Sequence, residues 1–231
     1  MLKAILFDLD HTLYDREASL QRMMPDFWDK VREYINDGVS FERFKELMIE
    51  AEHLHNYHTW KDRLEYMDSH GALKKYPDPE EYRYIFNSTM GPFCVNYDFT
   101  FKLLSDIRDM EYKTGLVTNG FTEIQETKLK TLGLSGCFDT ICICGMRGKQ
   151  KPEPEPFLET AEALNMRPEE CIYVGDNPRN DILGAKRVGM KTLWVATLGP
   201  WKYYEYPRPD YAVVNVGELG AILPVIAKDM E

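Results

Sequence analysis

The chain alternates between short runs of apolar, β-branched residues and longer stretches in which apolar residues recur every three or four positions. The short runs predict buried strands, and the longer stretches predict amphipathic helices. The predicted strands are Lys3–Phe7, Lys113–Val117, Thr140–Ile143, Cys171–Val174, Lys191–Val195 and Tyr211–Val214. The helices predicted between them are Phe99–Met110, Thr122–Leu132, Pro154–Leu164, Asn180–Val188 and Gly217–Ala227. This alternation predicts an α/β fold with a doubly wound parallel sheet.

One long segment interrupts the alternation. Residues 16–96 show helical spacing of apolar residues without strand-like runs, and they include predicted helices at Thr59–Met67 and Pro79–Met90. We therefore expect an α/β core formed by residues 1–15 and 97–231, with residues 16–96 as an inserted α-helical domain. Both connections of the insertion lie near the end of the first strand, where a lid over a site would hinge.

Polar residues gather directly after the predicted strands. In doubly wound sheets the ligand binds beyond the carboxyl ends of the strands, so the loops at these ends are the candidate sites. The candidate loops are Asp8–Thr12, Thr118–Gly120, Gly145–Pro152 and Gly175–Asp181.

The first of these loops, in AILFDLDHTLYD, carries two aspartates separated by one leucine. At about 3.3 Å per residue, Asp8 and Asp10 would lie about 6.6 Å apart along an extended chain. A bend after the strand would bring both carboxylates to one reacting atom, where one could attack and the other transfer protons. Such a pair is weak evidence by itself, because loop acids and helix caps produce the same pattern.

The other loops supply complementary chemistry. Thr118 and Asn119 end the second predicted strand with a hydroxyl and backbone amides, which suits a phosphoryl oxygen. Lys151 follows a glycine-containing loop and could attract the same anion. Asp176 and Asp181 follow the fourth predicted strand, and carboxylate oxygens are the ligands that magnesium prefers.

Charge and cysteine usage narrow the class of partner. A net charge of -10 argues against nucleic acid polymers and anionic membranes, since both need a basic surface. The five cysteines are odd in number and scattered, which indicates a reducing cytoplasm and not a disulfide framework. The apolar run at the N-terminus ends at Asp8 and is too short for a signal peptide or membrane anchor. We expect a cytoplasmic protein whose partner is a small molecule, and nothing in the sequence indicates an oligomeric state.

The motifs FDLDHTL, VTNG, KP and GDNPRND occur in this order, each at a predicted strand end. Together they resemble the haloacid dehalogenase (HAD) superfamily of hydrolases, in the phosphatase branch with a helical cap inserted after the first motif. The resemblance spans nearly the whole chain and implies a Rossmann-like core beneath the cap. Dehalogenating members lack an acid equivalent to Asp10, so its presence favours phosphate chemistry over carbon–halogen cleavage.

The resemblance implies a role for each residue that handles phosphate. Asp8 would be the nucleophile that takes the phosphoryl group, and Asp10 would protonate the leaving oxygen and then deprotonate the hydrolytic water. Thr118 would hydrogen-bond the transferring phosphoryl, with Asn119 beside it in the substrate-binding loop. Lys151 would neutralise charge on the phosphoryl group and on Asp8.

The same resemblance implies a magnesium cofactor. Asp8 and the backbone carbonyl of Asp10 would bind the ion, Asp176 would be the third protein ligand, and Asp181 would support the site directly or through water. His11 stands where related sequences often carry glycine, asparagine or aspartate, and we interpret it as loop filler or as a residue that touches substrate.

These observations predict a magnesium-dependent phosphatase that hydrolyses a small phosphomonoester, such as a nucleotide, sugar phosphate or phospho-acid, through an aspartyl-phosphate. Two alternatives stay open. A phosphomutase of the same fold would return the phosphoryl group to a sugar, and a non-catalytic binding or regulatory protein would bind ligand without releasing phosphate.

Overall fold

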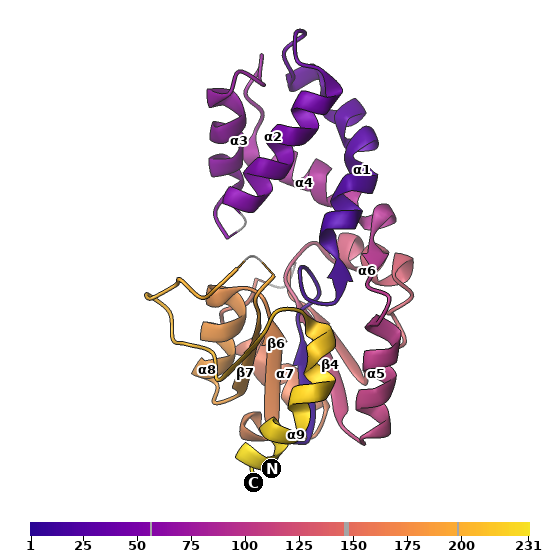
Figure 1. The fold of residues 1–231 in the computed structure, drawn as a ribbon, viewed down its shortest axis with the longest axis vertical. Coiled ribbons are helices and arrows are strands. Elements are labelled where there is room, and N and C mark those ends of the chain that lie inside the picture. The colour runs from indigo at the N-terminus through magenta and orange to yellow at the C-terminus, as the bar shows by residue number, and fades with distance from the viewer. Residues whose placement is uncertain (56, 146–147, 198) are drawn as a thin grey trace. The chain divides into compact units, whose positions relative to one another are not determined.

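The computed structural model describes residues 1–55, 57–145, 148–197 and 199–231. Its contacts divide the chain into two compact units, of which one comprises Met1–Arg16 with Val95–Glu231 and the other comprises Glu17–Cys94. The first unit contains the sheet, and the second contains the inserted helices (Figure 1).

A parallel sheet of six strands forms the centre of the first unit (Figure 1). The strands are β1 (Ala4–Phe7), β4 (Lys113–Thr118), β5 (Thr140–Ile143), β6 (Cys171–Gly175), β7 (Lys191–Val195) and β8 (Tyr211–Val213). Their order is β5-β4-β1-β6-β7-β8, so β1 lies between β4 and β6. All four residues of β1 are buried, which explains why its sequence is apolar without alternation. The predicted α/β fold is confirmed.

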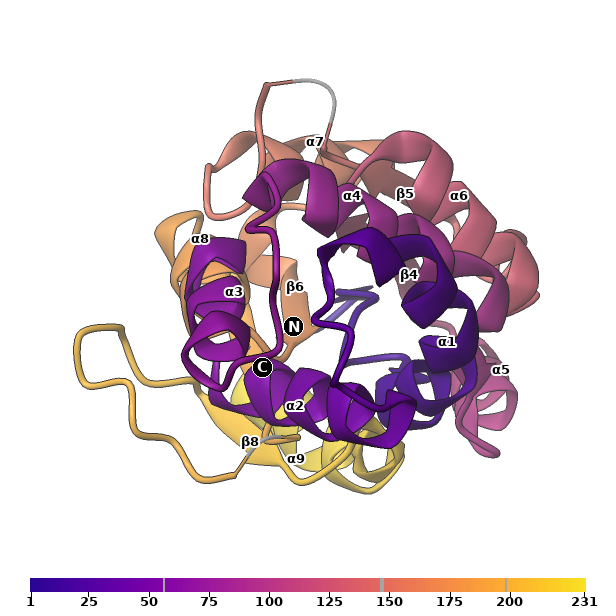
Figure 2. The same ribbon diagram turned by 90° about the horizontal axis from the view of Figure 1, so that it is seen from above.

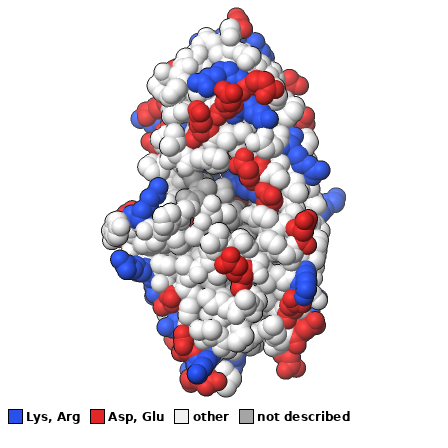
Figure 3. Space-filling model, in the orientation of Figure 1, with Lys and Arg blue, Asp and Glu red and all other residues white. Residues whose placement is uncertain are grey.

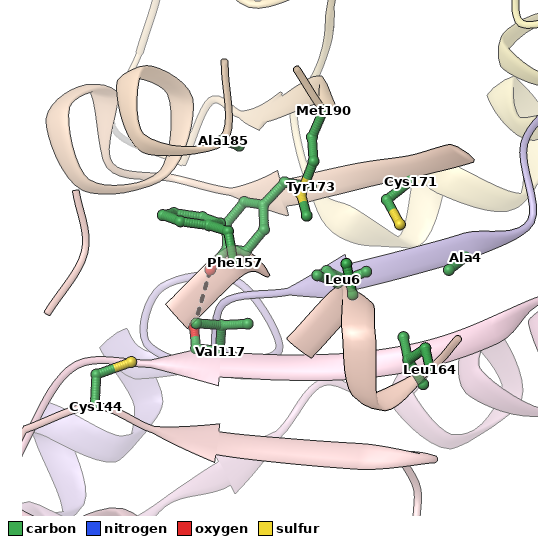
Figure 4. Packing of buried hydrophobic residues seen from close by; sticks show 11 residues of the cluster. Ala4, Leu6, Val117, Cys144, Phe157, Leu164, Cys171, Tyr173, Ala185 and Met190 are labelled. Atoms are coloured by element: carbon green, nitrogen blue, oxygen red, sulfur yellow. Dashed lines mark hydrogen bonds between the residues drawn. The ribbon is translucent and has the colours of Figure 1, made fainter. Parts of the chain in front are cut away.

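Aromatic packing joins the sheet to α7 (Glu155–Ala163), as Figure 4 shows. The ring of Phe157 meets Tyr173 of β6 edge-on, with ring centres 4.9 Å apart. Both side chains are fully buried, and burying one such side chain contributes about 1.5–3 kcal/mol. Gly115 lets α7 approach β4, because a Cβ atom there would lie 2.9 Å from Cγ2 of Thr160.

The remaining helices of this unit are α5 (Thr100–Asp109), α6 (Thr122–Thr131), α8 (Gly184–Arg187) and α9 (Leu219–Asp229). The sequence predicted one helix over residues 180–188, but the structure has a π-helix, Pro178–Leu183, followed by α8. The side chain of Asn177 accepts hydrogen bonds from the N–H groups of Arg179 and Asn180, which starts the helical path earlier than predicted. Widened turns of this kind are frequent at functional sites.

Two aspartates clamp the outer strand pairs at their amino ends. Asp139 precedes β5 and accepts hydrogen bonds from the N–H (2.8 Å) and the hydroxyl (3.3 Å) of Thr114 in β4. Asp210 precedes β8 and accepts from the N–H (2.9 Å) and the hydroxyl (2.8 Å) of Thr192 in β7. Both β4 and β7 begin with a Lys-Thr pair. The lysine of each pair contacts the aspartate that its own threonine contacts, Asp139 for β4 and Asp210 for β7. The same arrangement therefore holds the strand register on both sides of the sheet.

The inserted unit consists of α1 (Arg16–Val31), α2 (Phe41–Leu54), α3 (Trp60–Ser69) and α4 (Pro79–Met90), which Figure 2 shows arranged around a common centre. Phe27 of α1 lies at this centre. Its ring centre lies 5.3 Å from that of Tyr82 and 5.2 Å from that of Phe86, both edge-on, and 6.0 Å from that of Phe44. The helical spacing seen in the sequence thus corresponds to an aromatic core.

Capping residues mark the starts of the two helices of this unit whose bounds were predicted, α3 and α4. Thr59 and Asp62 form a reciprocal capping box at the start of α3. Asp78 accepts hydrogen bonds from two N–H groups at the start of α4, where Pro79 takes the first helical position. These caps explain why both helices begin within one residue of their predicted starts.

A short antiparallel ribbon was not predicted from the sequence. It pairs β2 (Tyr14–Asp15) with β3 (Val95–Asn96), at the two points where the chain passes between the units. The side-chain amide of Asn96 donates to the carbonyl of Leu132 at 2.8 Å, which ties the ribbon to the end of α6.

Acidic and basic side chains are interspersed on the face of the molecule shown in Figure 3. In the described part of the chain, some acidic and basic side chains pair one helical turn apart, such as Lys102 with Asp106 at 2.7 Å in α5. Exposed pairs of this kind contribute little to stability. Within the described part of the chain, every helix is too short or too polar to cross a lipid bilayer.

The Asp210 clamp predicts a pH-dependent contribution to stability. Burial acts to raise the pKa of Asp210, but hydrogen bonds from Lys186 and Thr192 outweigh it and hold the pKa below its usual value. Asp210→Asn should therefore lower the free energy of unfolding by about 1 kcal/mol at pH 7. A lowered folded pKa stabilises above the unfolded value of 3.8, so the difference from wild type should shrink as the pH falls below that value.

Urea unfolding between pH 3 and 7 would measure this difference, with Asp109→Asn, a substitution at an exposed residue of α5, as the control. A pH-independent difference would contradict the electrostatic account of the clamp.

Candidate active site

Three neighbouring strands bring the predicted polar residues together. Asp8 follows β1, Thr118 ends β4 and Asp176 follows β6. Because β1 lies between the other two strands, these residues meet at the same end of the sheet. The N–H of Asp8 donates to the carbonyl of Val174 at 2.9 Å, which continues the strand pairing one residue further. All three polar side chains are buried, so their charges and hydroxyl need partners within the protein.

The ammonium group of Lys151 is the partner of two carboxylates. It donates to Oδ1 of Asp8 at 2.7 Å, to Oδ1 of Asp181 at 2.7 Å and to the hydroxyl of Tyr173 at 2.8 Å. Tyr173 in turn donates to the carbonyl of Val117 at 2.9 Å (Figure 4). Burial acts to lower the pKa of Lys151, but the carboxylates of Asp181 and Asp8 outweigh it and raise the pKa well above its usual value. Lys151 therefore stays charged although it is buried.

The backbone of Lys151 is held by Asn119. The side-chain amide of Asn119 donates to the Lys151 carbonyl at 2.9 Å, and its oxygen accepts from the Lys151 N–H at 3.0 Å. This exchange occupies both ends of the Asn119 side-chain amide. In this structure the amide therefore contacts the loop that carries Lys151. The loop predicted from Gly145 to Pro152 includes residues 146 and 147, which lie outside the described residues.

Two glycines let loops of the site approach each other. A Cβ atom on Gly145 would lie 1.6 Å from the carbonyl oxygen of Gly120, so no side chain fits there. A Cβ atom on Gly175 would lie 2.4 Å from Oδ2 of Asp181. Glycine at position 175 thus allows Asp181 to fold back toward the strand end, where its Oδ2 accepts from the N–H of Asn177 at 2.8 Å.

The carboxylates of Asp8, Asp176 and Asp181 each offer an oxygen atom, and these atoms lie within 4.8 Å of one another. All three residues are buried, and the ammonium of Lys151 contacts two of them, Asp8 and Asp181. Burial, together with Asp181 and Asp10, raises the pKa of Asp8 to about 7, although Lys151 acts to lower it. Three buried carboxylates that offer oxygen ligands this close together fit a magnesium ion.

The carboxylate of Asp10 points to a different set of partners. Its two oxygens accept from the ammonium of Lys128 at 2.7 and 2.8 Å, and Oδ1 also accepts from Arg16 at 3.2 Å and from the hydroxyl of Tyr14. Gln125 donates to Oδ2 at 3.1 Å. Burial acts to raise the pKa of Asp10, but Lys128 and Arg16 outweigh it and hold the pKa well below its usual range. Asp10 is therefore ionised in this geometry.

His11 adopts a left-handed backbone conformation, with φ 61°. Glycine, asparagine and aspartate tolerate this region better than most residues. The carbonyl of His11 accepts from the hydroxyl of Thr197 at 3.2 Å. The backbone requirement at this position is thus visible, whereas a contact between the imidazole and substrate stays a prediction.

The sequence did not predict the residues that contact Asp10, nor the contact that the hydroxyl of Tyr173 makes with Lys151. Gln125 and Lys128 lie three residues apart on α6, a spacing that places them on the same helix face and could have been noticed. Tyr173 was assigned to a buried strand, and only the tertiary structure shows that its hydroxyl reaches Lys151.

The chain was compared with known proteins. A family model described as haloacid dehalogenase-like hydrolase matches residues 2–189. The chain belongs to this family. The resemblance predicted from the motifs is thereby confirmed.

Two curated relatives of this HAD-like hydrolase match nearly the whole chain. N-acylneuraminate-9-phosphatase of Mus musculus is 28% identical, over 97% of this chain and 95% of that protein. Glyceraldehyde 3-phosphate phosphatase of Methanopyrus kandleri is 31% identical, over 99% of this chain and 100% of that protein. Its relatives thus include phosphatases of matching length.

Solved structures share the fold. A HAD phosphatase from Thermococcus onnurineus superposes with a TM-score of 0.64 at 31% identity, covering 96% of this chain and 98% of that one. The putative HAD-hydrolase YfnB from Bacillus subtilis, solved with bound magnesium, gives a TM-score of 0.73 at 21% identity with the same coverage.

The cluster of three aspartate carboxylates predicts metal binding, which can be measured without following a reaction. Asp176→Asn should weaken magnesium affinity by at least about tenfold, because a neutral amide replaces one of three clustered carboxylates. Isothermal titration calorimetry with magnesium chloride would measure the affinity, and thermal unfolding would check the fold. Asp106→Asn, on the surface of α5, serves as the control. Equal affinity in wild type and Asp176→Asn would remove Asp176 from the ligand set.

Proposed function

We propose that this HAD-like hydrolase is a magnesium-dependent phosphatase that hydrolyses a small phosphomonoester. The observation that carries the proposal is the buried ion pair of Lys151 with Asp8, set beside Asp176 and Asp181 at the carboxyl end of the sheet. A carboxylate held next to a fixed positive charge and an oxygen-lined cation site is suited to attack a phosphoryl group.

The relatives support the same chemistry and narrow the substrate. Two relatives that match nearly the full chain are named for N-acylneuraminate-9-phosphate and glyceraldehyde 3-phosphate chemistry, and both names describe phosphatases. We infer a sugar phosphate or a similar small phosphorylated compound as the substrate.

Each proposed step uses a residue at the end of a strand. An oxygen of Asp8 attacks phosphorus, and the bond from phosphorus to the leaving oxygen breaks while Asp10, in its protonated form at this step, gives that oxygen its proton. Water then attacks phosphorus, Asp10 takes a proton from the water, and the bond to Asp8 breaks to release phosphate. Thr118 and Lys151 donate hydrogen bonds to the phosphoryl oxygens, where negative charge is concentrated.

Asp8, Asp176 and Asp181, with the backbone carbonyl of Asp10, would hold the magnesium ion. When bound, the ion supplies positive charge that offsets the repulsion between an anionic carboxylate and an anionic phosphate. The ionised Asp10 seen beside Lys128 is the form that takes a proton from water in the second step.

Replacement of the proposed nucleophile gives the direct test. Asp8→Asn should lower phosphate release by on the order of 10⁴-fold or more, because an amide oxygen is a far poorer nucleophile than a carboxylate. The assay would follow phosphate release from sugar phosphates, nucleotides and phospho-acids, with magnesium and with EDTA. Asp26→Asn, at an exposed residue of α1, is the matched control.

Retained turnover in Asp8→Asn would eliminate Asp8 as the nucleophile. Isomerised sugar phosphate with little free phosphate would point to a phosphomutase, and metal binding with no turnover of any kind would point to a non-catalytic protein.

A further inference from the structure

Gln125 and Lys128 form a buried polar face on α6, the helix that follows the Thr118 loop. They lie three residues apart and therefore on the same side of the helix. Gln125 is 1% exposed and Lys128 is 2% exposed. Residues of these types are seldom buried to this extent unless their polar groups are paired, so their contacts define what they do.

Lys128 contacts both oxygens of Asp10, at 2.7 and 2.8 Å. A two-point contact with a buried ammonium fixes the rotation of the carboxylate about its own bond. Since the two residues are 118 positions apart in the chain, this contact sets the position of the first loop relative to α6.

Gln125 links the same carboxylate to Thr118. Its side-chain nitrogen lies 3.1 Å from Oδ2 of Asp10 and 3.3 Å from the carbonyl of Asn119, and it contacts Oγ1 of Thr118. A carboxylate and a backbone carbonyl only accept hydrogen bonds, so the NH₂ end of the amide must face them. Thr118 then accepts from Gln125, and its own hydroxyl hydrogen remains to be donated elsewhere.

The backbone conformation of Gly120 matches this arrangement. Its φ is 144°, and a Cβ atom there would lie 3.1 Å from both Cγ and Cδ of Gln125. A side chain at position 120 would therefore press against the glutamine and move its amide from the three acceptors.

We propose that Gln125 and Lys128 are positioning residues for hydrolysis, with Lys128 holding the ionised Asp10 that takes a proton from the attacking water and Gln125 directing the hydroxyl hydrogen of Thr118 toward the phosphoryl group. The inference rests on the proposed phosphatase function. It assigns the two proton-handling groups of the site to one helix face.

Two kinetic parameters for p-nitrophenyl phosphate separate these roles. The p-nitrophenolate leaves as an anion without needing a proton, and kcat/KM reports the transfer of the phosphoryl group to Asp8. At saturating substrate, kcat also contains the attack of water on the aspartyl-phosphate, where Asp10 takes the proton. Loss of Asp10 orientation should therefore lower kcat and spare kcat/KM.

Lys128→Met should lower kcat by about 10- to 100-fold with a change of less than about threefold in kcat/KM, and a burst of p-nitrophenolate should precede the slow steady state. Gln125→Met should lower kcat/KM by about tenfold or more, because Thr118 acts on the phosphoryl group itself. Lys130→Met, at an exposed position of the same helix, should match wild type. Magnesium affinity should be unchanged in all three variants, because the substitutions leave the three clustered carboxylates in place.

Equal losses in kcat and kcat/KM in Lys128→Met, or no loss, would overturn the role of Lys128. If Lys128→Met does not fold, Gln125→Met decides the proposal, and wild-type kcat/KM in that variant would overturn it. A wild-type protein that hydrolyses neither p-nitrophenyl phosphate nor any member of the wider phosphate panel would overturn the proposed function instead, and the positioning roles with it.

Discussion

The ammonium group of Lys151 allows two carboxylates to be buried at the end of the sheet. Removing Asp8 and Asp181 from water is costly unless a positive charge is shared between them. Lys151 lies 2.7 Å from an oxygen of each, and the hydroxyl of Tyr173 takes its third hydrogen. Removal of one partner from such a group costs about 3–5 kcal/mol, because a buried charge remains unpaired. The Asn119 contact and the glycine at position 175 both serve to hold this group in place.

Much of the fold and half of the site could be predicted because the relevant signals are local. Strand β1 is apolar throughout since it is buried on both faces, and Asp8 is noticeable because it ends that run. Asp176 follows the next buried strand in the same way. The rule that ligands bind beyond the strand ends then brings together residues that are far apart in the chain.

The other half of the candidate site depends on tertiary contacts: the spacing of Gln125 and Lys128 places them on one face of α6, but it does not show what that face contacts. Lys128 and Gln125 read as ordinary surface-type residues of an amphipathic helix, and only the packing of α6 against the first loop brings them to Asp10. The helical path begins earlier than predicted, at Pro178, because of one asparagine side chain. The β2–β3 ribbon pairs two-residue segments, which are too short to show a periodic pattern of apolar residues. Position in space, not residue type, decides these features.

The aspartate clamps lie at the amino ends of the strands, whereas the candidate site lies at the carboxyl ends. Strand register on both sides of the sheet is therefore secured without help from the loops that would meet a substrate. Because the loops at the carboxyl ends do not hold the register, they can change in length and composition during evolution without shifting the strands. A scaffold of this kind can change its preference from one small phosphorylated compound to another while the arrangement of its charged groups stays the same.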